Sequence, residues 1–213
     1  MMEQVSATRS ELLARRARIR LAVQGRDLLK ERRSALISEF DRLGMSALES
    51  IDLLDREAAG AGQLLGIAIA GEGREPLDSA AFAAEDGIEV SVRTRSVAGV
   101  QVVEIEKNEV ARARTSRGYS LVATSARIDT VAERFESVLD KLLDVAGLEL
   151  SVRRLADEIA RTTRRMNALE HVVVPRLEAE RARISLVLEE RELEDRVRLR
   201  RMRAQGHRDG IRP

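Results

Sequence analysis

The 213-residue chain lacks cysteine and tryptophan, and it has only three prolines, three phenylalanines and one tyrosine. Without cysteine it forms neither a disulfide framework nor a metal site built on thiolates. Aromatic rings each bury on the order of 150–250 Å² in globular cores, and so few rings cannot anchor a core of this size. The longest apolar run, residues 64–70, is far shorter than the ~20 residues that cross a bilayer.

The first residues lack the basic-then-apolar order of a secretory signal. We therefore expect a protein on the cytoplasmic side of the membrane, without direct membrane insertion. The 37 basic and 36 acidic side chains leave a net charge of +1, so no global attraction to nucleic acid is expected. The composition is 44% hydrophobic, almost all aliphatic, and 34% charged. Long helices have this composition, because they bury a narrow stripe and solvate a wide face.

Proline and glycine divide the sequence into segments. Five of the thirteen glycines fall within residues 60–73, which predicts an interruption there. We expect a mainly α fold with four segments: an N-terminal coiled-coil helix in 1–58, starting near residue 5; a middle section in 59–118 with a glycine-rich loop; a C-terminal coiled-coil helix in 119–204; and a flexible tail in 205–213.

The first helix carries apolar residues spaced alternately by three and four. This period of 3.5 predicts a left-handed coiled coil, and Thr8 followed by Glu11 predicts its N-cap. Polar residues occupy the intervening positions Arg15, Arg26 and Arg33, together with Ser50. The predicted seam consists of Leu12, Ile19, Ala22, Leu29, Leu36, Phe40, Leu43, Ala47 and Leu54.

The second helix has a similar seam, with polar members at Glu149 and Thr162. The step from Val152 to Leu155 follows another step of three, which predicts local overwinding. Pro175 removes one backbone donor and predicts a kink near His171. The predicted seam consists of Ile128, Val131, Phe135, Val138, Leu142, Val145, Val152, Leu155, Ile159, Met166, Leu169 and Val173, and it continues through Leu177, Ile184 and Leu188.

Both seams need a partner, and the simplest arrangement pairs them in a long antiparallel two-helix coiled coil. The middle section has a different period. Residues 87–95 alternate apolar and polar, and residues 100–105 form a second β-branched run after Gly99. This pattern predicts a short β-hairpin at about 87–106, which needs support from the helices or from another subunit.

The sequence has few candidates for chemistry. It contains neither a phosphate-binding loop nor a dinucleotide fingerprint, and His171 and His207 lie far apart without a matched acid. Among the carboxylates at 189–195, Glu192 and Glu194 have Arg196 and Arg198 at i+4, which favours a solvated ion-pair face over a metal or acid–base site. We therefore expect no catalytic residue, no metal and no cofactor.

The 34 arginines, against three lysines, are concentrated in short clusters. Three interpretations stay open: a solvated face, contact with acidic loops of a protein partner, and nucleic-acid binding. Nucleic acid is the least favoured, because stacking aromatics are absent and acidic residues are interleaved throughout.

Three motifs resemble the D subunits of V-type and archaeal-type ATPases and ATP synthases. The first runs Ala22-x-x-Gly25-x-x-Leu28-Leu29-Lys30-x-Arg32-Arg33-x-x-Leu36-x-x-Glu39-Phe40. The second is the central Val97-Ala98-Gly99-Val100, and the third is Arg164-Arg165-Met166-Asn167-Ala168-Leu169-Glu170, followed by Pro175 and Leu188-Glu189-Glu190-Arg191-Glu192. The resemblance spans nearly the whole chain in the family's order.

The resemblance implies a central rotor shaft that has no nucleotide site. Its implied partners are the nucleotide-binding A and B subunits, the small F subunit, and a socket subunit (C or d) above the membrane ring. It implies coupling between ATP turnover and transport of protons or sodium. The subunit-interface candidates are Arg164, Arg165, Asn167, Glu170, Glu190, Arg191, Lys30, Arg33, Val97, Gly99 and Val100.

Two other functions remain as alternatives. One is a stand-alone coiled-coil scaffold or adaptor without motor function, which would melt cooperatively at low concentration. The other is a coiled coil that binds nucleic acid through its basic tail, which would give steeply salt-dependent binding to duplex DNA.

Overall fold

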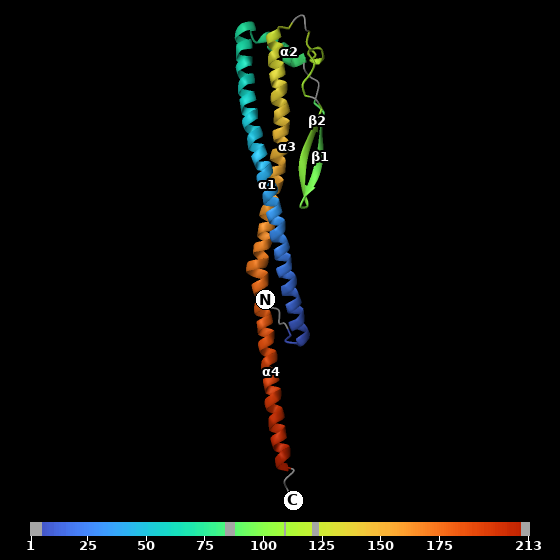
Figure 1. Ribbon diagram of the computed structural model, residues 1–213, viewed down its shortest axis with the longest axis vertical. Helices are drawn as coiled ribbons and strands as arrows, with labels where there is room; N and C mark the ends of the chain where they lie inside the picture. Colours follow the sequence, from blue (N-terminus) through green and yellow to red (C-terminus); the bar gives the residue numbers. More distant parts are fainter. Residues whose placement is uncertain (1–5, 84–87, 109, 121–123, 210–213) are drawn as a thin grey trace. The chain divides into compact units, whose positions relative to one another are not determined.

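A computed structural model describes residues 6–83, 88–108, 110–120 and 124–209, with side chains up to residue 202. Internal contacts divide the chain into unit 1 (residues 1–33 and 161–213) and unit 2 (residues 34–160). In chain order the elements are α1 (Arg9–Glu72), α2 (Glu75–Ala83), β1 (Val90–Val97), β2 (Val100–Lys107), the 3-10 turn η1 (Arg114–Ser116), α3 (Ala126–Ala168), the π turn η2 (Leu169–Val173) and α4 (Val174–Asp209) (Figure 1).

The start of α1 confirms the predicted cap. The hydroxyl oxygen of Thr8 accepts a hydrogen bond from the backbone N–H of Glu11 at 3.2 Å. The carbonyl of Thr8 accepts another from the N–H of Leu12 at 3.0 Å. The first bond satisfies a donor that a helix N-terminus otherwise leaves without a partner, and the second is the first bond within the helix, so the helix begins at Arg9. Residues 1–5 of the predicted segment lie outside the described residues.

The predicted end of the first helix at residue 58 is wrong, because α1 continues through the glycine cluster to Glu72. Each interior glycine costs a helix roughly 1 kcal/mol relative to alanine. Ala61 and Ala68 are buried between these glycines, and their packing offsets that cost. The helix ends at Glu72, and the next residue, Gly73, has a φ of 83°, the left-handed conformation that closes many helices.

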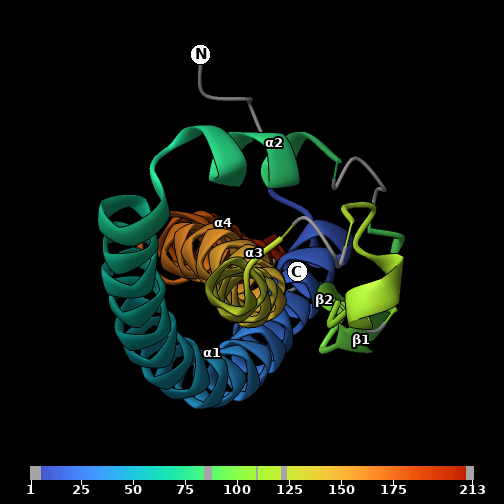
Figure 2. The ribbon, with the colours of Figure 1, turned by 90° about the horizontal axis from the view of Figure 1, so that it is seen from above.

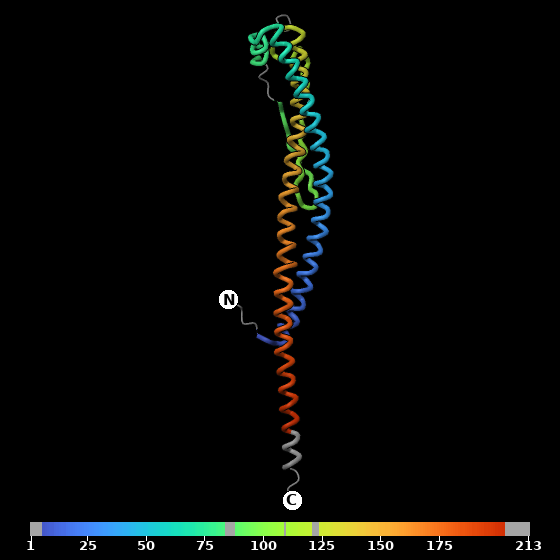
Figure 3. The backbone as a smooth tube through the Cα atoms, turned by 90° about the vertical axis from the view of Figure 1, so that its left-hand side faces the viewer, coloured from blue at the N-terminus to red at the C-terminus, as the bar shows by residue number. Residues whose placement is uncertain are grey.

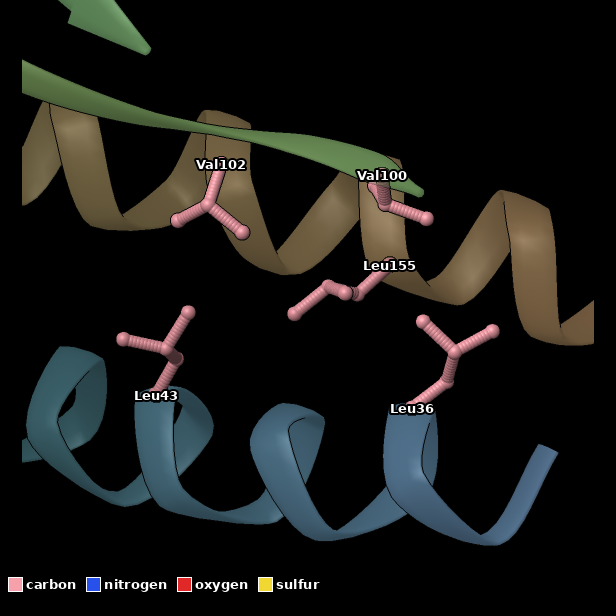
Figure 4. Close-up of a cluster of buried hydrophobic side chains, with 5 residues drawn as sticks. All are labelled: Leu36, Leu43, Val100, Val102 and Leu155. Carbon is pink, nitrogen blue, oxygen red and sulfur yellow. The ribbon is translucent and has the colours of Figure 1, made fainter. Parts of the chain in front are cut away.

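Two apolar clusters form the core of unit 2. Figure 4 shows the first, in which Leu36 and Leu43 of α1 point toward Leu155 of α3 and toward Val100 and Val102 of β2. The second cluster joins the end of α1, α2 and the start of α3 through Ala68, Leu77, Ala80, Ile128 and Val131. In unit 2, α1 and α3 run side by side in Figures 1 and 3, and α2 lies crosswise to α3 in Figure 2.

The predicted β-hairpin is confirmed as an antiparallel pair of strands, with Val97 opposite Val100. Its two-residue turn contains Ala98 at φ 48° and Gly99 at φ 82°. Positive φ at both positions is the type I′ geometry, whose twist matches that of the flanking strands. The hairpin packs against α3. Gly147 of α3 lies so close to the hairpin that a side chain there would come within 3.2 Å of Ile105.

The seam on α1 is confirmed, because every predicted member is buried or half-buried. On the second helical segment, Phe135, Leu142 and Val173 are exposed instead. The reason on α3 is that this helix packs against the hairpin as well as α1. Ser151 is buried on the hairpin side, so burial on α3 is divided between two faces and a single stripe does not describe it.

The C-terminal segment begins later than predicted, at Ala126, and it is not one uninterrupted α-helix. The π turn Leu169–Val173 separates α3 from α4. Pro175 lacks an N–H for the carbonyl of His171, and its ring crowds that carbonyl. A π turn is one way in which a helix accommodates such an interruption, so the disruption lies where the sequence predicts it.

In unit 1, the seam of α1 packs against α3, η2 and α4. Ile184 of α4 and Thr162 of α3 are buried there. A side chain at Gly25 would lie 4.0 Å from Leu169, so α1 passes close to the π turn. Within the described ranges, every helix is too short or too polar to cross a bilayer.

Candidate subunit interface

A groove of about 250 Å³ lies between α1 and the end of α3 in unit 1. Its α1 side presents Arg26, Lys30 and Arg33, which follow one another at i, i+4 and i+7 and therefore share a helix face. Met166 and Glu170 line the other side, again four residues apart. The fold thus brings together Lys30, Arg33 and Glu170, three interface candidates from motifs that are far apart in the sequence.

The groove combines cationic and anionic groups. The guanidinium of Arg26 donates two hydrogen bonds to Asp27, at 3.0 and 2.8 Å. This pairing raises the pKa of Arg26 above its ordinary value, and the charge of Glu170 adds to the effect. Such a groove suits recognition of a polar protein segment.

Nearer the N-terminus, ion pairs connect α1 with α4 in unit 1. Arg15 is buried at a seam position and pairs with Glu11 at 3.0 Å and with Glu180 of α4 at 3.3 Å. Arg9 pairs with Glu192 of α4 at 2.7 Å. The unit 1 seam therefore includes a buried charged residue, Arg15, among its half-buried apolar members.

The other helical candidates fall into two classes. Arg191 donates a hydrogen bond to the carbonyl of Ala7 at 3.1 Å, so it connects α4 to the start of the chain. The remaining ones are exposed along α3 and α4 and do not line the groove; they are Arg164, Arg165, Asn167 and Glu190.

The candidates in the central motif also divide. Gly99 is exposed at the tip of the hairpin. Val100 is buried in the first core cluster of unit 2, and Val97 is half-buried against it. The side chain of Val100 therefore contributes to internal packing, and a contact of this residue with another subunit stays a prediction.

Sequence reasoning missed a buried charge cluster in unit 2. Arg117 is only 3% exposed, and it donates to both carboxylate oxygens of Glu136 at 2.9 Å. It also lies 3.5 Å from Asp129, which accepts a 2.7 Å hydrogen bond from the hydroxyl of Tyr119. The spacing of Asp129, Glu133 and Glu136 on one face of α3 was the available signal.

The charge cluster shifts two pKa values. The hydrogen bonds to Glu136 raise the pKa of Arg117, although burial alone would lower it. Burial raises the pKa of the Tyr119 hydroxyl, and its hydrogen bond to Asp129 raises it further. Both groups therefore keep their protons at neutral pH, and the cluster fastens residues 117–119 to α3.

The same region of unit 2 contains a largely apolar cavity of about 610 Å³. Leu77 of α2 and Ile128, Val131 and Phe135 of α3 are among its lining residues. In the part of the chain that the structure describes, no group of three or more acidic or histidine side chains is arranged to hold a metal ion.

Residues 11–204 match the sequence family of ATP synthase D subunits. The chain belongs to this family. It is 41% identical over 200 residues to the D subunit of the A-type ATP synthase from Thermococcus gammatolerans, and the match covers 94% of each chain. The A-type D subunit of Archaeoglobus fulgidus is 37% identical over 95% of this chain and 97% of its own. That of Methanoregula boonei is 34% identical over 96% and 98%.

The match to the family of D subunits includes the groove, the hairpin and the charge cluster, because all three lie within residues 11–204. The resemblance found in the three short motifs is therefore confirmed over nearly the whole chain. This family member is mainly helical, and its short β-hairpin lies between the long helices in the sequence.

Proposed function

We propose that the protein is the central rotor shaft of an A-type ATP synthase. In this function it carries torque between a ring of nucleotide-binding subunits and a membrane rotor that transports protons or sodium. It has no catalytic site of its own. The part of the complex that contains this subunit is peripheral to the membrane and lies on its cytoplasmic side.

The observation that supports this proposal most is the pairing of the chain's two ends in a protein that matches A-type D subunits over nearly their full length. In unit 2, Leu36 of α1 and Leu155 of α3 are both 0% exposed and belong to one cluster. Two helices joined by an apolar cluster of this kind resist separation. This stiffness is what transmission of torque requires.

The proposed partners follow from the family. The A and B subunits surround the paired helices, the small F subunit binds beside the shaft, and the socket subunit (C or d) connects it to the membrane ring. The groove at Lys30, Arg33 and Glu170 and the exposed Arg164 and Arg165 supply polar contacts to these partners. The assignment of these residues to particular partners is part of the same proposal.

The shaft couples by its shape, and no single ion pair carries the load. Moving one charge through about 100 mV takes about 2.3 kcal/mol, whereas an exposed ion pair contributes about 0.2–1 kcal/mol. Several ions per ATP exceed what one such contact holds. Distributed, individually weak arginine contacts therefore suit a rod that meets successive catalytic subunits.

A buried charge in the unit 2 seam tests the proposal. Leu155→Asp places an unpaired carboxylate in the core and costs about 3–5 kcal/mol, so we expect failed assembly or ATP hydrolysis without ion transport. The control is Ala156→Asp, which introduces the same charge at the exposed neighbouring position. ATP-driven ion uptake into vesicles by the reconstituted complex is measured; normal uptake with Leu155→Asp would contradict the role of the seam.

A further inference from the structure

The two edges of the β-hairpin differ in what covers them. The outer edge of β2 faces α3, where the hydroxyl oxygen of Ser151 accepts from the N–H of Val103 at 2.9 Å. Arg154 of α3 donates to the carbonyl of Gln101 at 3.2 Å. Side chains of α3 therefore bond to the outward N–H and C=O of Val103 and to the outward C=O of Gln101.

The register fixes which backbone groups of β1 point outward. Val97 and Val100 close a two-residue turn, so they form a hydrogen-bonded pair, and bonded and non-bonded pairs alternate from there. Thr94 lies opposite Val103, whose N–H and C=O both face α3. The N–H and C=O of Thr94 therefore point away from β2.

The same alternation extends along β1. Ser96, Val92 and Val90 lie at the same phase as Thr94, so four residues direct their N–H and C=O groups to the open edge. All four are exposed, and across the described ranges no element pairs with this edge. The strand also contains neither a proline nor a bulge, two of the features with which proteins shield an edge.

The charges on β1 indicate what kind of strand fits the edge. Its only charged residues are Arg93 and Arg95. Arg93 pairs with Glu106 of β2, and Arg95 pairs with Glu104 of β2 and with Glu39 of α1. The two arginine side chains nevertheless remain 73% and 50% exposed. Residues directly opposite one another on neighbouring strands interact, so carboxylates opposite these arginines stabilise a pairing.

A second copy of this chain is a poor occupant for the same reason. Pairing β1 with β1 would bring arginines close to arginines, because the strand offers no carboxylate. Like charges on neighbouring strands are destabilising. The edge therefore favours a different chain that supplies acidic residues.

We propose that the open edge of β1 binds an extended segment of another protein chain, which adds a third strand to the hairpin and places acidic side chains beside Arg93 and Arg95. Backbone hydrogen bonds to Val90, Val92, Thr94 and Ser96 give the affinity, and the two arginines give the selectivity. The segment belongs to another subunit of the complex. The contact is expected whether this subunit rotates or stays fixed within the complex, so the proposal does not depend on the rotor function.

Hydrogen exchange tests the proposal with a control inside the same strand. The amides of Val92 and Thr94 point outward, whereas those of Arg93 and Arg95 already bond to β2. Exchange is followed by mass spectrometry with residue-level fragmentation, in the isolated full-length chain and in the assembled complex. We expect exchange at Val92 and Thr94 to slow at least tenfold in the complex, with far smaller changes at Arg93 and Arg95.

Equal exchange at Val92 and Thr94 in the two states would overturn the proposal. Slow exchange there in an isolated chain that runs as a dimer would also overturn it, because the occupant would then be a second copy. Loss of torque coupling with protection intact would count against the rotor function alone, so the two proposals fail separately.

A pair of substitutions gives a second readout. Thr94→Pro removes the outward N–H and leaves the bonds to β2 intact, which is the position where an edge strand tolerates proline. Thr94→Ala changes the side chain and keeps the N–H. We expect Thr94→Pro to lower retention of the subunit in the complex about tenfold, and Thr94→Ala less than twofold. Equal retention would overturn the proposal, and the exchange measurement on the unchanged chain decides it if Thr94→Pro fails to fold.

Discussion

The two units join their helices by different means. In unit 2, Leu36, Leu43 and Leu155 meet in an apolar cluster together with the hairpin. In unit 1, Arg15 occupies a buried seam position and is held by Glu11 and Glu180. Apolar burial does not depend on ionic strength, whereas salt screens the exposed pair of Arg9 with Glu192 and, to a smaller extent, the partly buried pairs of Arg15. The helix α1 therefore pairs through apolar contacts in unit 2, which we call the firm joint. In unit 1 it pairs partly through ion pairs, which we call the adjustable joint.

The largest effect is expected from a cavity in the firm joint. Leu36→Ala removes a fully buried side chain and costs about 2–5 kcal/mol of unfolding free energy. Leu48→Ala changes an exposed leucine of the same helix, so its cost stays within about 0.5 kcal/mol. Chemical denaturation of the isolated chain measures both. Similar costs for the two variants would show that the cluster does not hold unit 2 together.

A smaller, local effect is expected in unit 1. Arg15→Ala removes the partner that Glu11 and Glu180 share, which costs about 1–3 kcal/mol, and Glu180 keeps its pair with Arg176. Arg16→Ala removes an exposed neighbouring arginine as the control. Hydrogen exchange reports the free energy of local opening near the start of α1. We expect Arg15→Ala to accelerate exchange at least fivefold there without altering unit 2; no difference from Arg16→Ala would mean that the ion pairs are dispensable.

Acid is expected to weaken one contact of unit 2. Hydrogen bonds from Arg42, and also from Arg95 on the hairpin, hold the pKa of Glu39 at about 2 against an ordinary value of 4.5, while burial acts in the opposite direction. The contribution to stability is complete above pH 4.5 and is lost as the pH falls toward 2. It amounts to about 1 kcal/mol, because both arginines are at least half exposed.

Glu39→Gln checks this dependence, with Glu49→Gln at an exposed position as the control. The difference in unfolding free energy between the unchanged chain and Glu39→Gln is expected to be largest near neutral pH and to shrink between pH 4.5 and 2. A difference that stays constant over this interval would exclude Glu39 as the titrating group.

The smallest effect is expected at the exposed arginines. Alanine replacement of Arg164, Arg165 or Arg191, one at a time, is expected to leave ATP turnover of the complex within a few-fold, because the contacts are many and weak. Steady-state ATP hydrolysis by the purified complex measures this. A loss of turnover from any one of the three would contradict distributed coupling.

Periodicity predicted the parts of the fold in which one helix face meets one partner. The spacing of Leu36 and Leu43 predicted their burial on α1, and Gly99 between two β-branched runs predicted the hairpin. The prediction of an interruption failed for residues 59–72, because it rested on the low helix propensity of the glycines alone. The 3–4 spacing in fact continues through Ala61 and Ala68, and their burial outweighs the propensity of the glycines.

Contacts between distant segments could not be predicted from a single helical period. Phe135 and Leu142 lie on the expected stripe of α3 and are exposed, because the hairpin takes a second face of that helix. The Arg117 cluster depends on a loop that folds back onto α3, and its carboxylates are ordinary surface residues until that loop is placed. The sequence predicted the residues of the groove only in separate motifs, because Lys30 and Glu170 come together only when α1 pairs with η2.

Paired spin labels test the helix pairing most directly. One pair is placed at the exposed Leu28 and Arg165 in unit 1, and another at the exposed Met45 and Leu150 in unit 2. Helix axes about 8–10 Å apart predict one narrow, short distance distribution for each pair at low salt, with broadening at about 1 M salt for the unit 1 pair only. Broad, long distances for both pairs at low salt would show that the helices are not joined, and broadening of the unit 2 pair first would reverse the assignment of the firm and adjustable joints.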